Sequence, residues 1–486
     1  MRTLISSNID RVFTLFMLTL AVIVTLGLTG CGGGGSGSDS TVSPTTGVSA
    51  GQITGFGSII VNGVRFHTGG AELELEDGGT IALTNSNNED HLSLGMDVKV
   101  EGSFDDSGTG SAARISVDSS LEGPVANLAQ ADGIYTFSVL GQKVVAATGL
   151  TVVDDTVLGR SLTNLSDGMV IEVHGQPDGN GHIQASFIEW KAVDAVSVPP
   201  GSFELTGHVA SLDTDASTFL IGGQLVSYDG VTPEDGILIE GSLVEVKGDL
   251  NGATFVATDL EIKNGFGDHH KTEIEGLVTG LDPVAKSFMV RGQLVSYANA
   301  RFVGGIEEDL INSLKVEVEG SIVNGTLRAV KVKFKDNFRY EGNATQAGNA
   351  LLIHNPGGPD LNVTIHSVMT LGTASGGQVK VRARQLSGAN LLATRVEDGG
   401  NEERQVFKAP VVRIAEPLVE ILDMGDGSNG VIVVDTSTIH SDDFEIENII
   451  TTRADFFAAL QVGDIVKARW DNKDNRWDQI EIELED

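Results

Sequence analysis

Alternation of apolar and polar residues is clearest around a six-residue segment that occurs twice. The segment GQLVSY covers residues 223–228 and again residues 292–297, each time directly after a short apolar run and one turn residue, Gly222 or Arg291. Two alternating runs joined by a two-residue turn that contains glycine predict a β-hairpin, because glycine adopts positive φ at little cost. In the outgoing strand we expect Leu and Ser to face one side and Val and Tyr the other.

A second pattern shows that the hairpin belongs to a larger repeat. Runs of the form apolar-x-apolar-x-Gly (VKVEG, IEVHG, VEVKG and VEVEG) end at Gly102, Gly175, Gly248 and Gly320, at intervals of 73, 73 and 72 residues. Weaker versions in the C-terminal third carry Ala383 and Trp470 at the position of this glycine. Such constant spacing is typical of tandem duplication.

Each repeat contains the same predicted elements. A first strand leads into the hairpin, an acidic stretch with a short helical tendency follows, and the apolar run then forms a second hairpin around an Asn-Gly or Asp-Gly type turn, as at residues 251–252 and 324–325. About five strands in roughly 60–70 residues suit a small antiparallel barrel of the OB or SH3-like kind. The chain is therefore predicted to be all-β, a tandem array of about six small barrels, arranged as beads on a string or as a stacked rod.

The predicted units follow one another with short joins. We place them at residues 51–121, 122–197, 203–265, 272–337, 340–400 and 409–486, after a leader at 1–30 and a linker at 31–50. The last unit is divergent and carries an insertion in which residues 453–461 have helical spacing.

The repeats resemble the bacterial lipoproteins built from tandem copies of domain of unknown function 5666. The resemblance rests on the opening GQITGFGSIIVNGVRF at residues 51–66 and on the recurring V-x-V-x-G closure, and it covers nearly all of the chain after residue 50. It implies an exported array of repeats. No agreed activity comes with the family, so the resemblance indicates architecture and export rather than chemistry.

The first fifty residues carry targeting signals. Arg2 and Arg11 accompany an almost wholly apolar stretch at residues 12–28, and the sequence LTGC follows at Leu28, Thr29, Gly30 and Cys31. These four residues resemble the lipobox of bacterial lipoproteins, in which the cysteine is acylated and becomes the new N-terminus. Cys31 is the only cysteine. A transmembrane anchor with an incidental cysteine is the alternative interpretation.

Several further properties follow from this leader. The Gly/Ser-rich stretch after Cys31 should act as a flexible tether from the membrane. Gly32 rather than Asp after the cysteine implies, by resemblance to other lipoproteins, that the anchor lies in the outer membrane of the cell envelope. The lipid bilayer is then a partner through acylated Cys31, and with a single cysteine no intramolecular disulfide can form.

Composition and charge narrow the function. There are 67 acidic and 32 basic residues, for a formal net charge of -35, and a surface this negative repels phosphate backbones, so nucleic acid is not an expected partner. Aromatic residues make up only 5% of the chain, whereas glycines number 61, a balance that suits short strands and tight turns.

The search for reactive or metal-binding groups gives only weak candidates. No G-x-S-x-G, Walker, H-E-x-x-H or C-x-x-C motif occurs, and we expect no enzyme activity and no cofactor.

Metal ligands could come from Asp268, His269 and His270, although adjacent residues of an extended chain point to opposite sides and a solvated linker is the simpler interpretation. Oxygen-rich turns at residues 104–111, 423–430 and 471–478 could hold calcium or merely form tight turns. The carboxylate pairs Glu307-Glu308 and Asp442-Asp443 suit a solvated face better than an acid/base pair.

Two tyrosines are the tentative ligand-binding residues. Tyr228 and Tyr297, which end the two GQLVSY segments, would form a platform for sugars if they lay on a barrel rim, and part of the core if they pointed inward. The main hypothesis is a non-catalytic, lipid-anchored cell-envelope protein that acts as a multi-domain scaffold, spacer or adhesion module with an envelope protein or glycan as partner. The alternative is a carbohydrate- or cation-binding envelope protein that uses barrel loops.

Overall fold

The computed structural model describes residues 45–483 apart from a set of short internal gaps. These gaps are residues 57, 76–78, 85–86, 106–107, 118, 132, 149, 155–159, 264, 337, 366–369, 371, 373, 375, 388, 400–402 and 424–429. Strands dominate this part of the chain, and within it no helix is long and apolar enough to cross a membrane. The predicted leader and residues 31–44 of the predicted tether lie outside the described residues, whereas residues 45–50, also predicted as tether, belong to the first strand of the first barrel.

The first repeat forms a closed five-stranded barrel. Its first strand β1 (Thr45–Gly55) pairs antiparallel with β2 (Ile59–Val61), which pairs with β3 (Val64–His67). β3 lies parallel to β7 (Thr109–Val117), and β6 (Asp97–Phe104) joins β7 back to β1. A barrel in which the third and fifth main strands are parallel and the fourth closes on the first has OB-like connectivity. Between β3 and β6 lie β4 (Glu72–Glu74), β5 (Thr80–Ala82) and the 3-10 helix η1 (Asn88–Asp90).

The next three repeats form barrels with the same ladders. Barrel 2 contains β8 (Leu121–Ala131), β9 (Ile134–Val139), β10 (Gln142–Ala147), β11 (Val152–Val153), η2 (Leu162–Asn164), β12 (Val170–Pro177) and β13 (His182–Ala192). After η3 (Ala195–Ser197), barrel 3 contains β14 (Phe203–Asp213), β15 (Thr218–Ile221), β16 (Gln224–Ser227), β17 (Leu243–Asn251) and β18 (Thr254–Ile262). Barrel 4 contains β19 (Thr272–Leu277), β20 (Thr279–Asp282), β21 (Ser287–Val290), β22 (Gln293–Ser296), β23 (Arg301–Val303), η4 (Glu307–Asp309), β24 (Lys315–Val323) and β25 (Thr326–Phe334).

The last two repeats adopt the same plan, with a departure in the sixth. Barrel 5 contains β26 (Phe338–Ala347), β27 (Ala350–Ile353), β28 (Leu361–Thr364), β29 (Gly377–Ser387) and β30 (Asn390–Asp398). Barrel 6 contains β31 (Arg404–Ala415), β32 (Leu418–Asp423), β33 (Gly430–Asp435), η5 (Thr436–Thr438), β34 (Phe444–Ile446), β35 (Ile449–Ile450), α1 (Arg453–Ala459), β36 (Ile465–Asp471) and β37 (Arg476–Glu483). In barrel 6 the strand that runs parallel to β37 is β34 from the insertion. The predicted helix in this insertion is confirmed as α1, capped by Thr452, whose side chain accepts a hydrogen bond from the Asp455 backbone N–H.

The two GQLVSY hairpins form as the sequence predicts. Ile221 pairs with Gln224 across the first turn and Val290 with Gln293 across the second. Side chains alternate as expected, because Leu225 is 40% exposed while the neighbouring Val226 is fully buried.

The repeated glycine marks a β-bulge rather than a turn. In every barrel the register shifts between the fourth and fifth main strands, and in barrels 1 to 4 the repeated glycine of the fourth strand lies at this shift, opposite the extra residue of the fifth strand. A Cβ atom on Gly248 would lie 2.1 Å from the carbonyl oxygen of Val256, so close backbone approach explains the glycine. The shifts at Ala383 and Trp470 fall at the same place in barrels 5 and 6, which fits their alignment with the repeat.

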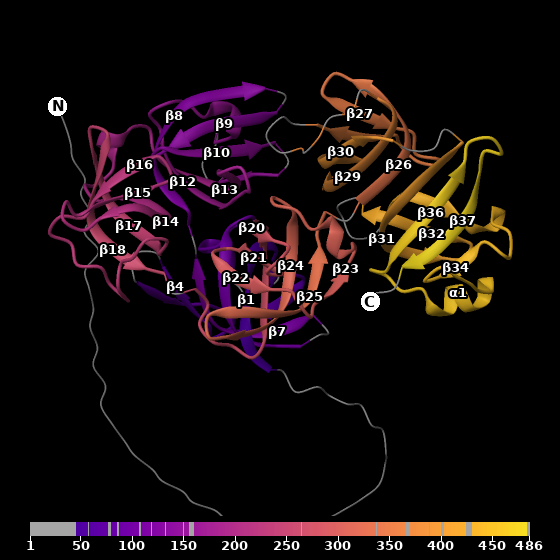
Figure 1. The fold of residues 1–486 in the computed structure, drawn as a ribbon, viewed down its shortest axis with the longest axis horizontal. Helices are drawn as coiled ribbons and strands as arrows, with labels where there is room; N and C mark the ends of the chain where they lie inside the picture. The colour runs from indigo at the N-terminus through magenta and orange to yellow at the C-terminus, as the bar shows by residue number, and fades with distance from the viewer. Residues whose placement is uncertain are drawn as a thin grey trace, which may run out of the picture. The chain divides into compact units, whose positions relative to one another are not determined.

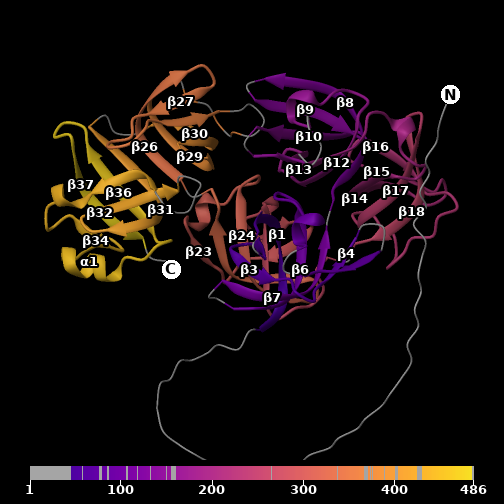
Figure 2. The same ribbon diagram turned by 180° about the vertical axis from the view of Figure 1, so that it is seen from behind.

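The barrels join in pairs through their first strands, and the order of pairing is not the order of the sequence. We call each such strand pairing a seam. Seam 1·4 is the parallel ladder between β1 and β19, seam 2·3 is the antiparallel ladder between β8 and β14, and seam 5·6 is the antiparallel ladder between β26 and β31. Figures 1 and 2 show the indigo strands of barrel 1 beside the later strands of barrel 4 from both sides. Three continuous sheets therefore replace the string of beads or the sequential rod considered from sequence.

Candidate functional site

The rings of both candidate tyrosines pack against the interior of their barrels. Tyr297 is 3% exposed and stacks on Phe288, with 5.6 Å between ring centroids. Tyr228 is half-buried, and its ring centroid lies 5.6 Å from that of Phe219 with the two rings tilted. Inward-facing positions in a period-2 strand explain both placements. A sugar-stacking platform needs an open ring face, which Tyr297 does not offer, so the core interpretation replaces the platform for this residue.

The candidate metal ligands do not converge in the described part of the chain. There, no group of three or more His, Cys, Asp or Glu side chains is arranged to hold a metal ion. The segment with Asp268, His269 and His270 is tied to barrel 4 by its backbone, since the carbonyl of His269 accepts from Ile322 N at 2.8 Å and that of His270 accepts from Ser321 Oγ at 2.7 Å. Asp268 Oδ1 accepts from Gly325 N at 3.4 Å.

The acidic turns and pairs have local partners where the structure describes them. Asp471 Oδ1 accepts from the backbone N–H groups of Lys473 and Asp474 at 2.8 and 3.0 Å, which is the chemistry of a tight turn. Much of the turn at 423–430 and part of the turn at 104–111 lie outside the described residues. Glu307 forms an ion pair with Lys286, and Asp442 accepts from Ser441 Oγ at 3.1 Å. Cys31 and the motif residues Leu28, Thr29 and Gly30 also lie outside the described residues.

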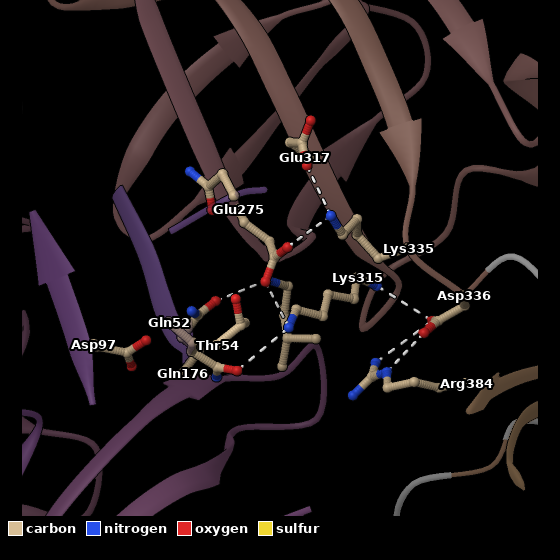
Figure 3. Close-up of polar contacts among 12 residues, drawn as sticks. Gln52, Thr54, Asp97, Gln176, Glu275, Lys315, Glu317, Lys335, Asp336 and Arg384 are labelled. Atoms are coloured by element: carbon tan, nitrogen blue, oxygen red, sulfur yellow. Dashed lines mark hydrogen bonds and ion pairs between the residues drawn. The ribbon is translucent and has the colours of Figure 1, made fainter. Parts of the chain in front are cut away.

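The most strongly built polar site lies where barrel 4 meets its neighbours, and Figure 3 shows its side chains. At its centre is Glu275, which is 4% exposed and lies on β19. Lys315 Nζ is 2.6 Å and Lys335 Nζ 3.0 Å from its two oxygens, and Lys335 also reaches Glu317 at 2.7 Å. Burial alone would raise the pKa of Glu275, but the two ammonium groups outweigh burial and hold this pKa far below its usual range.

This cluster connects three other barrels to barrel 4. Lys315 Nζ donates to Gln52 Oε1 of barrel 1 at 3.4 Å, and Gln176 Oε1 of barrel 2 accepts from the backbone N–H of Leu277 at 2.9 Å. Arg384 of barrel 5 donates through Nε to Asp336 at 2.7 Å, and Asp336 is fully buried. Gln52, Gln176 and Arg384 thus each contact barrel 4 from another barrel (Figure 3).

A cavity of about 80 Å³ lies among these contacts. Its polar lining comes from Gln52, Gln176, Lys315 and Arg384, together with Gln184, Ser186 and Thr151. A volume of this size has room for a few water molecules, and both cations in its wall are already paired with carboxylates. The arrangement is suited to holding barrels together, since each charged group has a fixed partner of opposite charge.

Seam 2·3 carries a second cluster of buried charge, a row of glutamates on adjacent strands. Glu122 lies opposite both Glu172 and Glu204 in the ladders. Lys191 pairs with Glu172 and lies 4.0 Å from Glu122, and His174 Nε2 is 2.7 Å from Glu172. Burial raises the pKa of Glu122 to about 7 against the opposing effect of Lys191, and the neighbouring glutamates add to the rise.

The pKa of Glu172, on the adjacent strand β12, shifts in the opposite direction. Burial would raise the pKa of Glu172 too, but the hydrogen bond and charge of His174, with Lys191, lower it to about 2. Cations therefore neutralise the charge of Glu172 well, but they do not neutralise that of Glu122 to the same degree.

Sequence reasoning missed both clusters of buried charge, because residues that face each other come from strands far apart in the chain. The alternation of Glu with apolar residues in IEVHG and VEVEG was the only available signal.

Fold and site together define a protein of tandem OB-like barrels whose buried charges join barrel to barrel. The family described as Domain of unknown function (DUF5666) matches the chain at residues 48–116, 122–189, 206–261 and 275–333. These matches span more than half of the sequence and coincide with barrels 1 to 4, and the chain belongs to this family. The comparison with curated proteins found no match to this chain.

Proposed function

We propose that this protein is a non-catalytic, lipid-anchored scaffold or spacer of the bacterial cell envelope. The lipobox-like residues Leu28 to Cys31 would supply the acylated anchor, Gly32 favours the outer membrane, and the Gly/Ser-rich stretch would separate the barrels from the bilayer. An envelope protein or glycan is the partner that such a scaffold would present or hold.

One observation carries this proposal. The first strand of every barrel is paired with the first strand of another barrel, and the buried ion pairs Arg291–Asp97 and Arg384–Asp336 each join two barrels. A buried charge pair is weak support for stability but defines geometry, because either partner alone would be strongly unfavourable. Fixed mutual positions of the barrels are what a spacer needs.

The scaffold is tested by distance measurements on the full chain. Spin labels at Val284→Cys in barrel 4 and Val462→Cys in barrel 6 would occupy positions that are 94% and 66% exposed. We expect a single narrow distance distribution, unchanged when the labelled protein is moved from detergent into vesicles. A broad distribution would mean that the barrels move independently, which is incompatible with a spacer.

The anchor is tested separately through Cys31. Cells that express the wild-type chain should incorporate labelled fatty acid into it, and the Cys31→Ser variant should remain an unacylated precursor. A matched Ser36→Cys addition in the Cys31→Ser background places a thiol five residues away, and it should not restore acylation if the lipobox directs the reaction. Acylation of the Cys31→Ser variant would refute the anchor while leaving the scaffold measurement intact.

A further inference from the structure

Seam 5·6 carries a row of cations that is unusual for so acidic a chain. Reading across adjacent strands, Arg382 on β29 lies opposite Arg339 on β26, Arg339 opposite Lys408 on β31, and Lys408 opposite Lys467 on β36. Arg395 on β30 extends the row beyond Arg382. Directly opposed residues share one face of a sheet, and like charges in this position repel. We call these five residues the basic row.

Carboxylates compensate the basic row only in part. Asp309, from the 3-10 helix η4 of barrel 4, accepts from Arg339 Nη2 at 2.6 Å and lies 3.0 Å from Arg382 Nη2. At the other end Lys467 pairs with Glu481 at 2.8 Å, and Lys408 pairs with Glu483. The two central guanidinium groups thus share a single carboxylate.

Two buried donors in the row have no acceptor. Among the described residues, Arg382 Nη1 and Arg339 Nε have no hydrogen-bond partner, although Arg382 is only 7% exposed. The remaining face of Arg382 packs on the Phe334 ring, with 5.1 Å from the guanidinium carbon to the ring centroid. A buried donor without an acceptor is rare and indicates a water or ion at that place. A guanidinium favours an oxyanion, because its planar fork matches two oxygens.

The electrostatics of the neighbouring lysine agree with an excess of positive charge. Burial lowers the pKa of Lys408 to about 8, and the repulsion from Arg339, Lys467 and Arg382 acts in the same direction, opposed by Asp309. The row is most exposed at its two ends, where the side chains of Arg395 and Lys467 are 42% and 37% exposed, and Arg339 between them is 26% exposed. An anion can therefore approach from either end.

We propose that the basic row of seam 5·6 binds a phosphate-type oxyanion, with Arg339 and Arg382 as its principal donors and with Arg395 and Lys467 at its two open ends. Asp309 of barrel 4 occupies part of the same donor set, so it competes with the anion and links occupancy of the row to the contact between barrels 4 and 5. The phosphoryl group could be a free ion or part of a lipid or glycan head group, since both present the same oxygens.

The test is calorimetric titration of the purified full chain with inorganic phosphate at low ionic strength. Lys467→Gln should weaken binding by about fivefold, the size of effect that a partly exposed charge gives. Lys473→Gln, in the β36–β37 turn outside the row, is the matched control and should change binding by less than about twofold. Separate titrations with inorganic phosphate and with glycerol phosphate identify the source, because tighter binding of the ester assigns the site to a head group.

A second variant should change the affinity for phosphate in the opposite direction. Asp309→Asn removes the competing carboxylate and should strengthen phosphate binding, whereas Glu308→Gln removes the same charge one residue away and should not. Circular dichroism of each variant controls for folding. Absence of saturable binding, or equal effects of Asp309→Asn and Glu308→Gln, overturns the proposal and assigns the two donors to buried water.

Discussion

Arg291 of barrel 4 forms an ion pair with Asp97 of barrel 1, a residue that lies 194 positions earlier in the chain. Arg291 occupies the first turn position of the second GQLVSY hairpin and has a φ of 51°, a strained value for a residue with a side chain. Its Nε also donates to the backbone oxygen of Glu275 at 2.6 Å. Arg291 stands where the first GQLVSY hairpin has Gly222, and its side chain stabilises seam 1·4.

Arg291→Met should open seam 1·4 specifically. Asp97 is 1% exposed, and loss of its partner leaves a buried carboxylate, which costs about 3–5 kcal/mol. Hydrogen exchange of the β1 and β19 amides, followed by mass spectrometry, should accelerate while exchange in seam 5·6 stays unchanged.

The matched control for this experiment is a surface ion pair in the same barrel. Lys286 and Glu307 are about 40% exposed, and Lys286→Met should change exchange in β1 very little, since exposed pairs contribute at most about 1 kcal/mol. Equal exchange in Arg291→Met and in the wild type would show that the parallel β1–β19 ladder holds without the ion pair.

Glu273 should give seam 1·4 a measurable pH dependence. This glutamate on β19 is 7% exposed, and burial raises its pKa to about 7, helped by Glu319 and Glu317 and opposed by Lys271 and Lys331. Its folded-state pKa lies above the unfolded value of 4.5, so the folded state binds the proton more tightly and the seam loses stability as the pH rises from about 4.5 to 7. Glu273→Gln should raise stability by about 1–3 kcal/mol at pH 8 and by much less at pH 5.

Glu275, two residues further along β19, provides the contrast. Its pKa is lowered by Lys315 and Lys335 against the effect of burial, so its stabilising contribution is present at neutral pH and is lost only in strong acid. Glu275→Gln should therefore lower the melting temperature at pH 8, the opposite of Glu273→Gln. The same sign for both variants at pH 8 would contradict the assignment of charges in this seam.

Gly248→Ala tests the explanation for the repeated glycine. The added Cβ would lie 2.1 Å from the Val256 carbonyl oxygen, and relieving such an overlap at a bulge costs about 1–3 kcal/mol. Gly223→Ala is the control, because the nearest atom to its Cβ is 3.7 Å away. Thermal unfolding should show barrel 3 destabilised in the first variant only; a neutral Gly248→Ala would mean that the bulge accepts a side chain, as it does at Ala383.

The sequence was sufficient for features that depend on neighbours within one repeat. The hairpins and the inward position of Val226 follow from alternation and turn residues, and the repeat follows from the 73-residue spacing. Seam 1·4 could not be predicted, because residues 48–50 and 272–274 are ordinary strand segments and their pairing depends on two folded barrels. The basic row was equally hidden, since Arg339 and Lys467 face one side of a sheet only after three strands from two barrels, β26, β31 and β36, have aligned.

Asn62→Asp should separate barrels 1 and 4 with the least possible change in shape. The Nδ2 group of Asn62 lies near three acceptors, Ser49 Oγ and the Ala50 oxygen at 3.0 Å and the Glu273 oxygen of barrel 4 at 3.3 Å. A carboxylate at this place has only acceptor atoms, so its contacts with the two carbonyl oxygens become repulsive, although the Ser49 hydroxyl can turn to donate to it. Loss of these bonds to a charged group in a partly buried site costs about 2–4 kcal/mol. Asn324→Asp is the control, because Asn324 has the same turn conformation, with φ of 52° against 54°, but is exposed. Hydrogen exchange in β1 and β19 should accelerate only in Asn62→Asp. Similar exchange in both variants would show that Asn62 serves its own turn alone and that seam 1·4 depends on the ladder and on Arg291.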